Sequence, residues 1–174
     1  MSILIINGSN NDASRINGVA QYIHEAAAKQ RIAVDEIVVH ELPAEVLIHA
    51  DYTSPAIHEA NAKVAAAQTI VVLTPVYKAA YSGILKTYLD LIPQKGLVGK
   101  TVLPIAVGGS HHHLLVIDYA LKPVLAAIGA TNTTQGVYIV DKQIERTEDG
   151  FAIDEEMTKR LDEQLAQVQR LQIV

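Results

Sequence analysis

Residues 68–86 read QTIVVLTPVYKAAYSGILK, an apolar run followed by an unusual loop and the start of a helix. A strand is predicted at residues 69–73, where Thr69 is followed by four apolar residues without alternation, which is typical of a strand buried on both faces of a sheet. The next segment, residues 74–83, contains a proline, two tyrosines and a glycine, whereas an ordinary connection needs only about two to six residues of turn chemistry. We therefore interpret residues 74–83 as a candidate ligand-binding loop.

Apolar runs and amphipathic segments continue to alternate on both sides of this stretch. Further strands are predicted at residues 2–6, 32–39, 101–107 and 135–140, helices at 14–29, 55–67, 83–91, 113–128 and 154–170, and a longer loop at 43–54. Ser14 is available as an N-cap, Pro55 suits the first turn of a helix, and Pro123 should kink the helix that contains it. Five strands alternating with helices predict an α/β protein with a parallel sheet covered on both faces, in a single domain over residues 1–174.

The composition excludes several classes of function. With 49% hydrophobic and 19% charged residues, the chain belongs with globular proteins, and the absence of cysteine excludes disulfides, thiolate nucleophiles and iron–sulfur ligation. Six of the 19 acidic residues fall within residues 145–156, and the 14 basic residues are scattered, so we expect no nucleic-acid partner. The first residues resemble neither a signal peptide nor a membrane span, which predicts a cytoplasmic protein.

Three loops should meet at one edge of the predicted sheet. In the five-strand order 2-1-3-4-5, the exit loops of strands one, three and four are neighbours, and ligands of open α/β sheets bind beyond the carboxyl ends of the strands. Loop one is GSNNDASRIN at residues 8–17, loop two is TPVYKAAYSG at 74–83, and loop three is GGSHHH at 108–113. We expect these loops to form a single crevice.

Loop one has the residues of a phosphate site. Ser9, Ser14 and Asn17 accompany Arg15 directly before a predicted helix, whose free N–H groups and dipole favour an anion. The alternative is a polar turn with Arg15 in solvent. The loop matches neither the GxxxxGK phosphate loop nor the GxGxxG dinucleotide pattern, which argues against a nucleoside triphosphatase and a standard NAD domain.

Loops two and three suit a flat ring. Val76 and Tyr77 would offer backbone polar groups beside an apolar and aromatic wall, and Gly83 would permit close approach. Alternatively, the tyrosines are partly buried packing residues. Loop three has a glycine pair followed by three histidines; consecutive side chains point in different directions, so we expect surface or ring-edge histidines and no metal site.

The segment from residue 74 to residue 129 contains TPVYKAAYSGILKTYLDLIP, VGGSHHHLL and IDYALKPVLAAIG. It closely resembles the NAD(P)H-dependent FMN reductases of the flavodoxin-like superfamily, and most of all the reductases of two-component alkanesulfonate monooxygenase systems. The resemblance implies a flavodoxin-like three-layer sandwich. It also implies FMN, with its phosphate on loop one and its isoalloxazine ring against loops two and three.

The resemblance assigns roles to individual positions. Phosphate contacts fall on Ser9, Ser14, Arg15 and Asn17; ribityl and ring contacts on Pro75, Val76, Tyr77, Ser82 and Gly83; and the far side of the ring on Gly108, Gly109, Ser110 and His113. Loop one departs from the usual family form GSPRxxSRS, because Asn10, Asn11 and Ile16 replace the proline, the first arginine and a serine. These replacements should weaken phosphate binding.

The implied activity is hydride transfer from NADPH or NADH to FMN. The cofactors carry this chemistry, so no catalytic side chain is expected. The resemblance further implies transfer of reduced flavin to a partner monooxygenase, and a homotetramer or dimer with Tyr119, on a bulged helix, at the interface. Two alternatives stay open: an FMN-retaining quinone, azo-dye or chromate reductase, and an electron-carrier flavodoxin.

Overall fold

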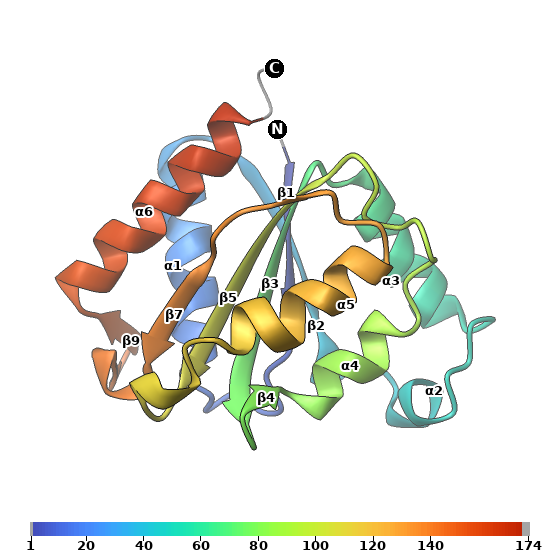
Figure 1. Cartoon of the computed structure of the whole chain (residues 1–174), viewed down its shortest axis with the longest axis horizontal. Coiled ribbons are helices and arrows are strands. Elements are labelled where there is room, and N and C mark those ends of the chain that lie inside the picture. Colours follow the sequence, from blue (N-terminus) through green and yellow to red (C-terminus); the bar gives the residue numbers. More distant parts are fainter. Residues whose placement is uncertain (1, 172–174) are drawn as a thin grey trace.

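The computed structural model describes residues 2–171 and places one twisted sheet between two layers of helices (Figure 1). The strands are β1 (Ser2–Asn7), β2 (Ala33–Val38), β3 (Thr69–Tyr77), β4 (Ala80–Tyr81), β5 (Thr101–Gly108), β6 (Asn132–Thr133), β7 (Val137–Val140), β8 (Ile144–Thr147) and β9 (Gly150–Ile153). The helices are α1 (Ile16–Lys29), α2 (Ala44–Ile48), α3 (Pro55–Ala66), α4 (Gly83–Leu89), α5 (Lys122–Ala127) and α6 (Glu155–Arg170). Shorter turns are the 3-10 segments η1 (Val39–Glu41), η2 (His111–His113) and η4 (Asp141–Gln143), and η3 (Ile117–Leu121) is a π-helix.

The main sheet has seven strands, so the prediction of five was wrong. Its path is β2-β1-β3-β5-β6, with β4 paired to β3 and β7 paired to β5. Both β6 and β7 run parallel to β5, so together they fill the fifth place of the predicted order. The break between them contains Gly136, whose φ is 86° and where a Cβ would lie 2.5 Å from the Pro104 carbonyl oxygen. The pairing with β5 is therefore interrupted around Gly136 and resumes in β7. The pattern of apolar residues does not reveal this interruption.

Helices cover both faces of the sheet (Figure 1). On one face lie α1 and α6, and on the other α3, α4 and α5. The side chains of β1 divide between the two cores: Ile3 and Ile5 belong to the α1 and α6 side, whereas Leu4 and Ile6 belong to the other. All four are at most 3% exposed. Burial on both faces explains the unbroken apolar run from which this strand was predicted.

The third long strand, β3, continues to Tyr77, although the sequence predicted its end at residue 73. Its pairing with β1 stops at Leu73, and beyond that point Pro75 is in register with β5. Proline has no N–H to donate, but Pro75 loses no hydrogen bond to β1, because the pairing with β1 has already ended. Val76 and Tyr77 then pair antiparallel with β4, so the first half of loop two is a hairpin.

The tip of this hairpin is conformationally strained. Lys78 and Ala79 have φ angles of 49° and 65°, in the left-handed region that favours glycine and asparagine. We expect the double substitution Lys78→Asn, Ala79→Gly to raise the free energy of unfolding by about 1 kcal/mol, because the new residues adopt this turn with less strain. Urea denaturation measures the change.

A matched control for this substitution is Ala62→Gly, at an exposed position in the interior of α3. There the same loss of a methyl group should lower the free energy of unfolding by about 1 kcal/mol, because glycine is unfavourable within a helix. If both variants lose stability alike, the hairpin tip holds no strain.

The segment predicted as one helix over residues 113–128 folds in pieces. It comprises η2, the π-helix η3 and α5, and Pro123 is the second residue of α5, directly after the π-helix. The expected kink is thus a π-helix immediately before the proline. This π-helix is the bulge that the resemblance implied, and it presents Tyr119 with 78% of its surface exposed.

The acidic stretch over residues 145–156, for which no strand was predicted, contains the hairpin β8–β9. Two smaller predictions were also wrong. The loop expected over residues 43–54 contains α2. Ser14 does not cap α1: Arg15 occupies the N-cap position, and no side chain caps the helix. Among residues 2–171 the structure has no helix long and apolar enough to span a membrane.

Candidate functional site

The carboxyl ends of β1, β3 and β5 lie side by side, and their exit loops meet at the lower edge of the sheet in Figure 1. A cavity of about 220 Å³ opens between these loops. The predicted residues that line it are Ser14, Arg15, Pro75, Val76, Tyr77, Gly108 and Gly109. Segments far apart in the sequence therefore form a single groove.

Two predicted residues of loop one shape the loop and do not line the cavity. Ser9 is fully buried, and its hydroxyl lies 3.3 Å from Nδ1 of His40. The Asn17 side chain donates to two carbonyl oxygens of loop one at 3.0 Å each, and its Oδ1 accepts from the Asn7 amide at 3.0 Å. Both polar groups are engaged within the protein, and so they hold the backbone of the loop in place.

Loop two is fixed to loop one through Ser82. This side chain is 1% exposed, donates to the Gly8 carbonyl at 2.7 Å, and accepts from the Leu85 N–H at 3.3 Å as the N-cap of α4. Ser82 is outside the cavity lining, as is Gly83, where no heavy atom lies within 4 Å of a Cβ built there. Glycine was expected here because it would permit close approach, but no protein atom lies close enough to exclude a larger side chain.

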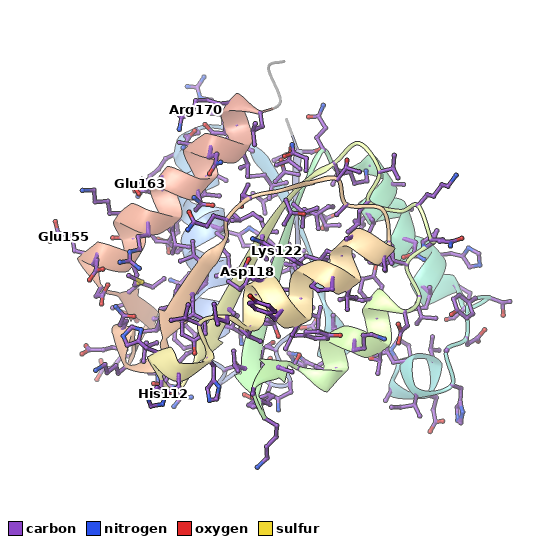
Figure 2. All side chains as sticks on the ribbon, in the orientation of Figure 1. His112, Asp118, Lys122, Glu155, Glu163 and Arg170 are labelled. Atoms are coloured by element: carbon purple, nitrogen blue, oxygen red, sulfur yellow. The ribbon has the colours of Figure 1, made fainter. Side chains whose placement is uncertain are left out.

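Loop three turns away from the groove after Gly109. The carbonyl of Ser110 accepts a hydrogen bond of 2.6 Å from the hydroxyl of Tyr138. Burial raises the pKa of Tyr138, and Asp141 raises it further, which keeps the phenol protonated as the donor. Neither Ser110 nor His113 lines the cavity, and Figure 2 shows His112 at the outer edge of the molecule.

Sequence reasoning missed several residues of the groove, above all Arg146 and Asp141. Arg146 stands in the hairpin β8–β9, in an acidic stretch for which the sequence predicted no strand and no site residue. The dipeptide Asp149–Gly150 is a hairpin signal that could have placed it in a two-stranded ribbon. Its proximity to loop one depends on tertiary packing, which no local pattern encodes.

A larger hollow, of about 600 Å³, lies between η3, β7 and α6. None of the predicted site residues lines it, and it is away from the carboxyl ends of β1 and β3. Its walls carry three carboxylates, Asp118, Glu156 and Glu163, against one arginine, Arg160, and this excess of negative charge disfavours an anionic ligand. We therefore take the smaller groove as the candidate ligand site, despite its size.

The groove has two chemically different kinds of lining. Arg15 and Arg146 supply positive charge, whereas Pro75, Tyr77 and Gly108 form an apolar and backbone-lined wall. Tyr77 closes the space between loops one and two, because its hydroxyl donates to the Asn10 side chain at 3.1 Å. Guanidinium groups suit phosphate, and the wall suits a flat ring.

Fold and groove together define an α/β protein of the flavodoxin-like type. The family model of the NADPH-dependent FMN reductases matches residues 1–145, and the chain belongs to this family. It is 43% identical over 144 residues to an FMN reductase (NADPH) of Pseudomonas putida KT2440, covering 83% of this chain and 73% of that protein. To an FMN reductase (NADPH) of Escherichia coli K12 it is 41% identical, covering 83% and 75%.

A solved structure extends the likeness beyond the family-matched region. The apo form of an NADH:FMN oxidoreductase, EMOB, superposes with a TM-score of 0.84 and 31% sequence identity. The match covers 96% of this chain and 87% of that protein. The resemblance seen in residues 74–129 is thereby confirmed at the level of the family and the fold.

Proposed function

We propose that this chain is an NAD(P)H:FMN oxidoreductase. The observation that carries the proposal is the groove itself, in a chain of this family: its lining combines Arg15 with a wall of Pro75, Tyr77 and Gly108. Bound FMN would supply the acceptor for a hydride from the nicotinamide. The protein's part is to bind the flavin and orient it toward the second nucleotide.

Each group of residues contributes a separate part of this binding. Arg15 attracts the phosphate monoester by charge, and its guanidinium is held by the Ile144 carbonyl at 2.9 Å. The wall at Val76 and Tyr77 replaces water along the ring, and Gly108 makes room for the Tyr138 side chain behind this wall, since a Cβ at Gly108 would collide with the Tyr138 hydroxyl. Asp141, the carboxylate in the lining, faces Arg15 at 4.0 Å.

Anaerobic mixing of the protein with FMN and NADPH or NADH tests the proposal. We expect the nicotinamide absorbance to fall together with the flavin absorbance, and neither to change when protein or FMN is omitted. The relatives named above differ in nucleotide, NADPH for two and NADH for EMOB, so both are assayed. No oxidation of either nucleotide would contradict the proposal and would leave an electron-carrier flavodoxin as the better account.

A second candidate is an FMN-retaining quinone, azo-dye or chromate reductase. Initial rates measured over a grid of NADPH and FMN concentrations separate the two. Intersecting lines in double-reciprocal plots indicate FMN as a substrate that is released, whereas parallel lines indicate a flavin that stays bound. Release would supply reduced flavin to a partner monooxygenase, which we propose as the consumer.

We also propose a cytoplasmic homo-oligomer, a tetramer or dimer, built through η3. Tyr119 is 78% exposed there, and Leu114 and Leu115 are 51% and 54% exposed on the preceding turns, an apolar surface suited to a second copy. Tyr119→Ala should reduce the mass measured by light scattering after gel filtration. An unchanged mass for the variant, or a monomeric parent protein, would exclude this interface.

A further inference from the structure

Loop one and the hairpin β8–β9 hold each other through two arginines. Arg15 of loop one donates from Nε to the Ile144 carbonyl at 2.9 Å. In return, Arg146 of the hairpin donates to the Ala13 carbonyl from Nε at 3.0 Å and from a terminal nitrogen at 2.5 Å. Arg146 stands on β8, the strand at which the family match ends.

The hairpin has a fixed position relative to α1. Phe151 packs on Gly18, where a Cβ would lie 2.6 Å from the Phe151 Cβ, so only glycine accommodates this contact. At its base, the Asp154 N–H donates to the Gln143 carbonyl at 3.0 Å. Figure 1 shows the hairpin at the lower left, beside α1 and the end of β7. Arg146 is therefore presented to loop one by packed secondary structure.

The charges in the groove favour a second cation for a phosphate that binds there. Its charged lining residues are Arg15, Arg146 and Asp141, and Asp141 lies 4.0 Å from Arg15 and offsets part of its charge. A phosphate monoester carries about −1.5 to −2 charges at neutral pH. Arg146 therefore adds a positive charge that Arg15 alone does not supply.

Arg146 has donors left for a ligand. A guanidinium has five N–H groups, and the Ala13 carbonyl is the one acceptor of Arg146 in the described part of the chain. Over the same residues no carboxylate lies within ion-pair distance of it. Its contact with Ala13 places it beside loop one, next to Ser14.

We propose that Arg146 is a second phosphate-binding residue, which the hairpin β8–β9 brings to the flavin site. The proposal rests on the proposed function and deepens it: a hairpin near the C-terminal helix takes part in recognition of the phosphorylated flavin, together with loop one. Arg146 compensates for loop one, which has a single arginine of its own. Selectivity for FMN over riboflavin, the flavin without the phosphate, is the property that it controls.

The test compares dissociation constants for FMN and riboflavin, from quenching of flavin fluorescence, in the parent protein, Arg146→Gln, Arg146→Lys and Arg170→Gln. Arg170→Gln removes an equal charge from the far end of α6, opposite the strand ends in Figure 2. Glutamine keeps a donor for the Ala13 carbonyl but loses the charge. We expect Arg146→Gln to weaken FMN about fivefold to tenfold with riboflavin unchanged, and Arg146→Lys and Arg170→Gln to retain most of the selectivity.

If Arg146→Gln keeps the FMN selectivity of the parent protein, Arg146 does not bind the phosphate. An equal loss of affinity for FMN and riboflavin would also overturn the proposal, because it would show that Arg146 only holds loop one in position. The melting temperature of the ligand-free variants checks that all of them fold. Failure of the proposed function gives a different result: the parent protein itself would then bind neither flavin.

Discussion

Replacing Arg15 by alanine raises the dissociation constant for FMN about 10- to 100-fold and leaves that for riboflavin almost unchanged. A hydrogen bond to a charged group contributes about 1.5 to 3 kcal/mol, and each 1.4 kcal/mol is a factor of about ten. Arg15 is partly exposed, with 35% of its side chain accessible, so the lower part of this range is expected. Quenching of flavin fluorescence measures both constants.

Lys29→Ala is the matched control for Arg15→Ala. It removes one positive charge from the exposed opposite end of the same helix, α1, and should leave both constants unchanged. The loss of the contact with Ile144 is monitored separately, by the melting temperature without ligand. If Arg15→Ala weakens riboflavin as strongly as FMN, Arg15 acts on the shape of the groove, and the phosphate lies elsewhere.

Replacing Gly8 by alanine lowers the free energy of unfolding by about 1 to 3 kcal/mol and also weakens flavin binding. A Cβ at this position would lie 2.7 Å from Cβ of Leu85 and 3.0 Å from the Leu73 carbonyl oxygen. Neither is the free end of a flexible side chain, and the Gly8 N–H already donates to Leu73 at 2.8 Å. Relief of the overlap must therefore displace α4 or loop one from the end of β3.

Gly83→Ala provides the comparison for Gly8→Ala, because a Cβ at Gly83 meets no heavy atom within 4 Å. Gly83 also starts α4, where alanine is the better helix former, so this variant should match or exceed the parent in urea denaturation. A Gly8→Ala protein as stable as Gly83→Ala would show that the junction of loop one with α4 is loosely packed.

The fold was predictable where burial alone determines local structure. Ile3 to Ile6 are buried on alternate faces, and their unbroken apolar run gave both a strand and its central place in a parallel sheet. Pro55 likewise marked the start of α3 correctly. The split of the fifth strand was not predictable, because Gly136 leaves the ladder through a contact with Pro104, distant in sequence.

The site was predictable in outline and less so in detail. Loop composition identified the three segments that meet at the groove, but it could not tell a polar side chain that faces a ligand from one that holds a loop together. Ser9 and Asn17 are of the second kind. The partner of Ser9 is His40, in η1, and the partner of Asn17 is Asn7, at the end of β1. Arg146 was missed for the same reason, since its contact with Ala13 joins residues at opposite ends of the chain.

A crystal structure of the protein with FMN tests the central claim most directly. The account predicts the phosphate within hydrogen-bonding distance of the Arg15 guanidinium, and the isoalloxazine ring along Pro75 to Tyr77 with Gly108 on its other side. Flavin density in the larger hollow between η3, β7 and α6, with the groove at the ends of β1, β3 and β5 left empty, would contradict it.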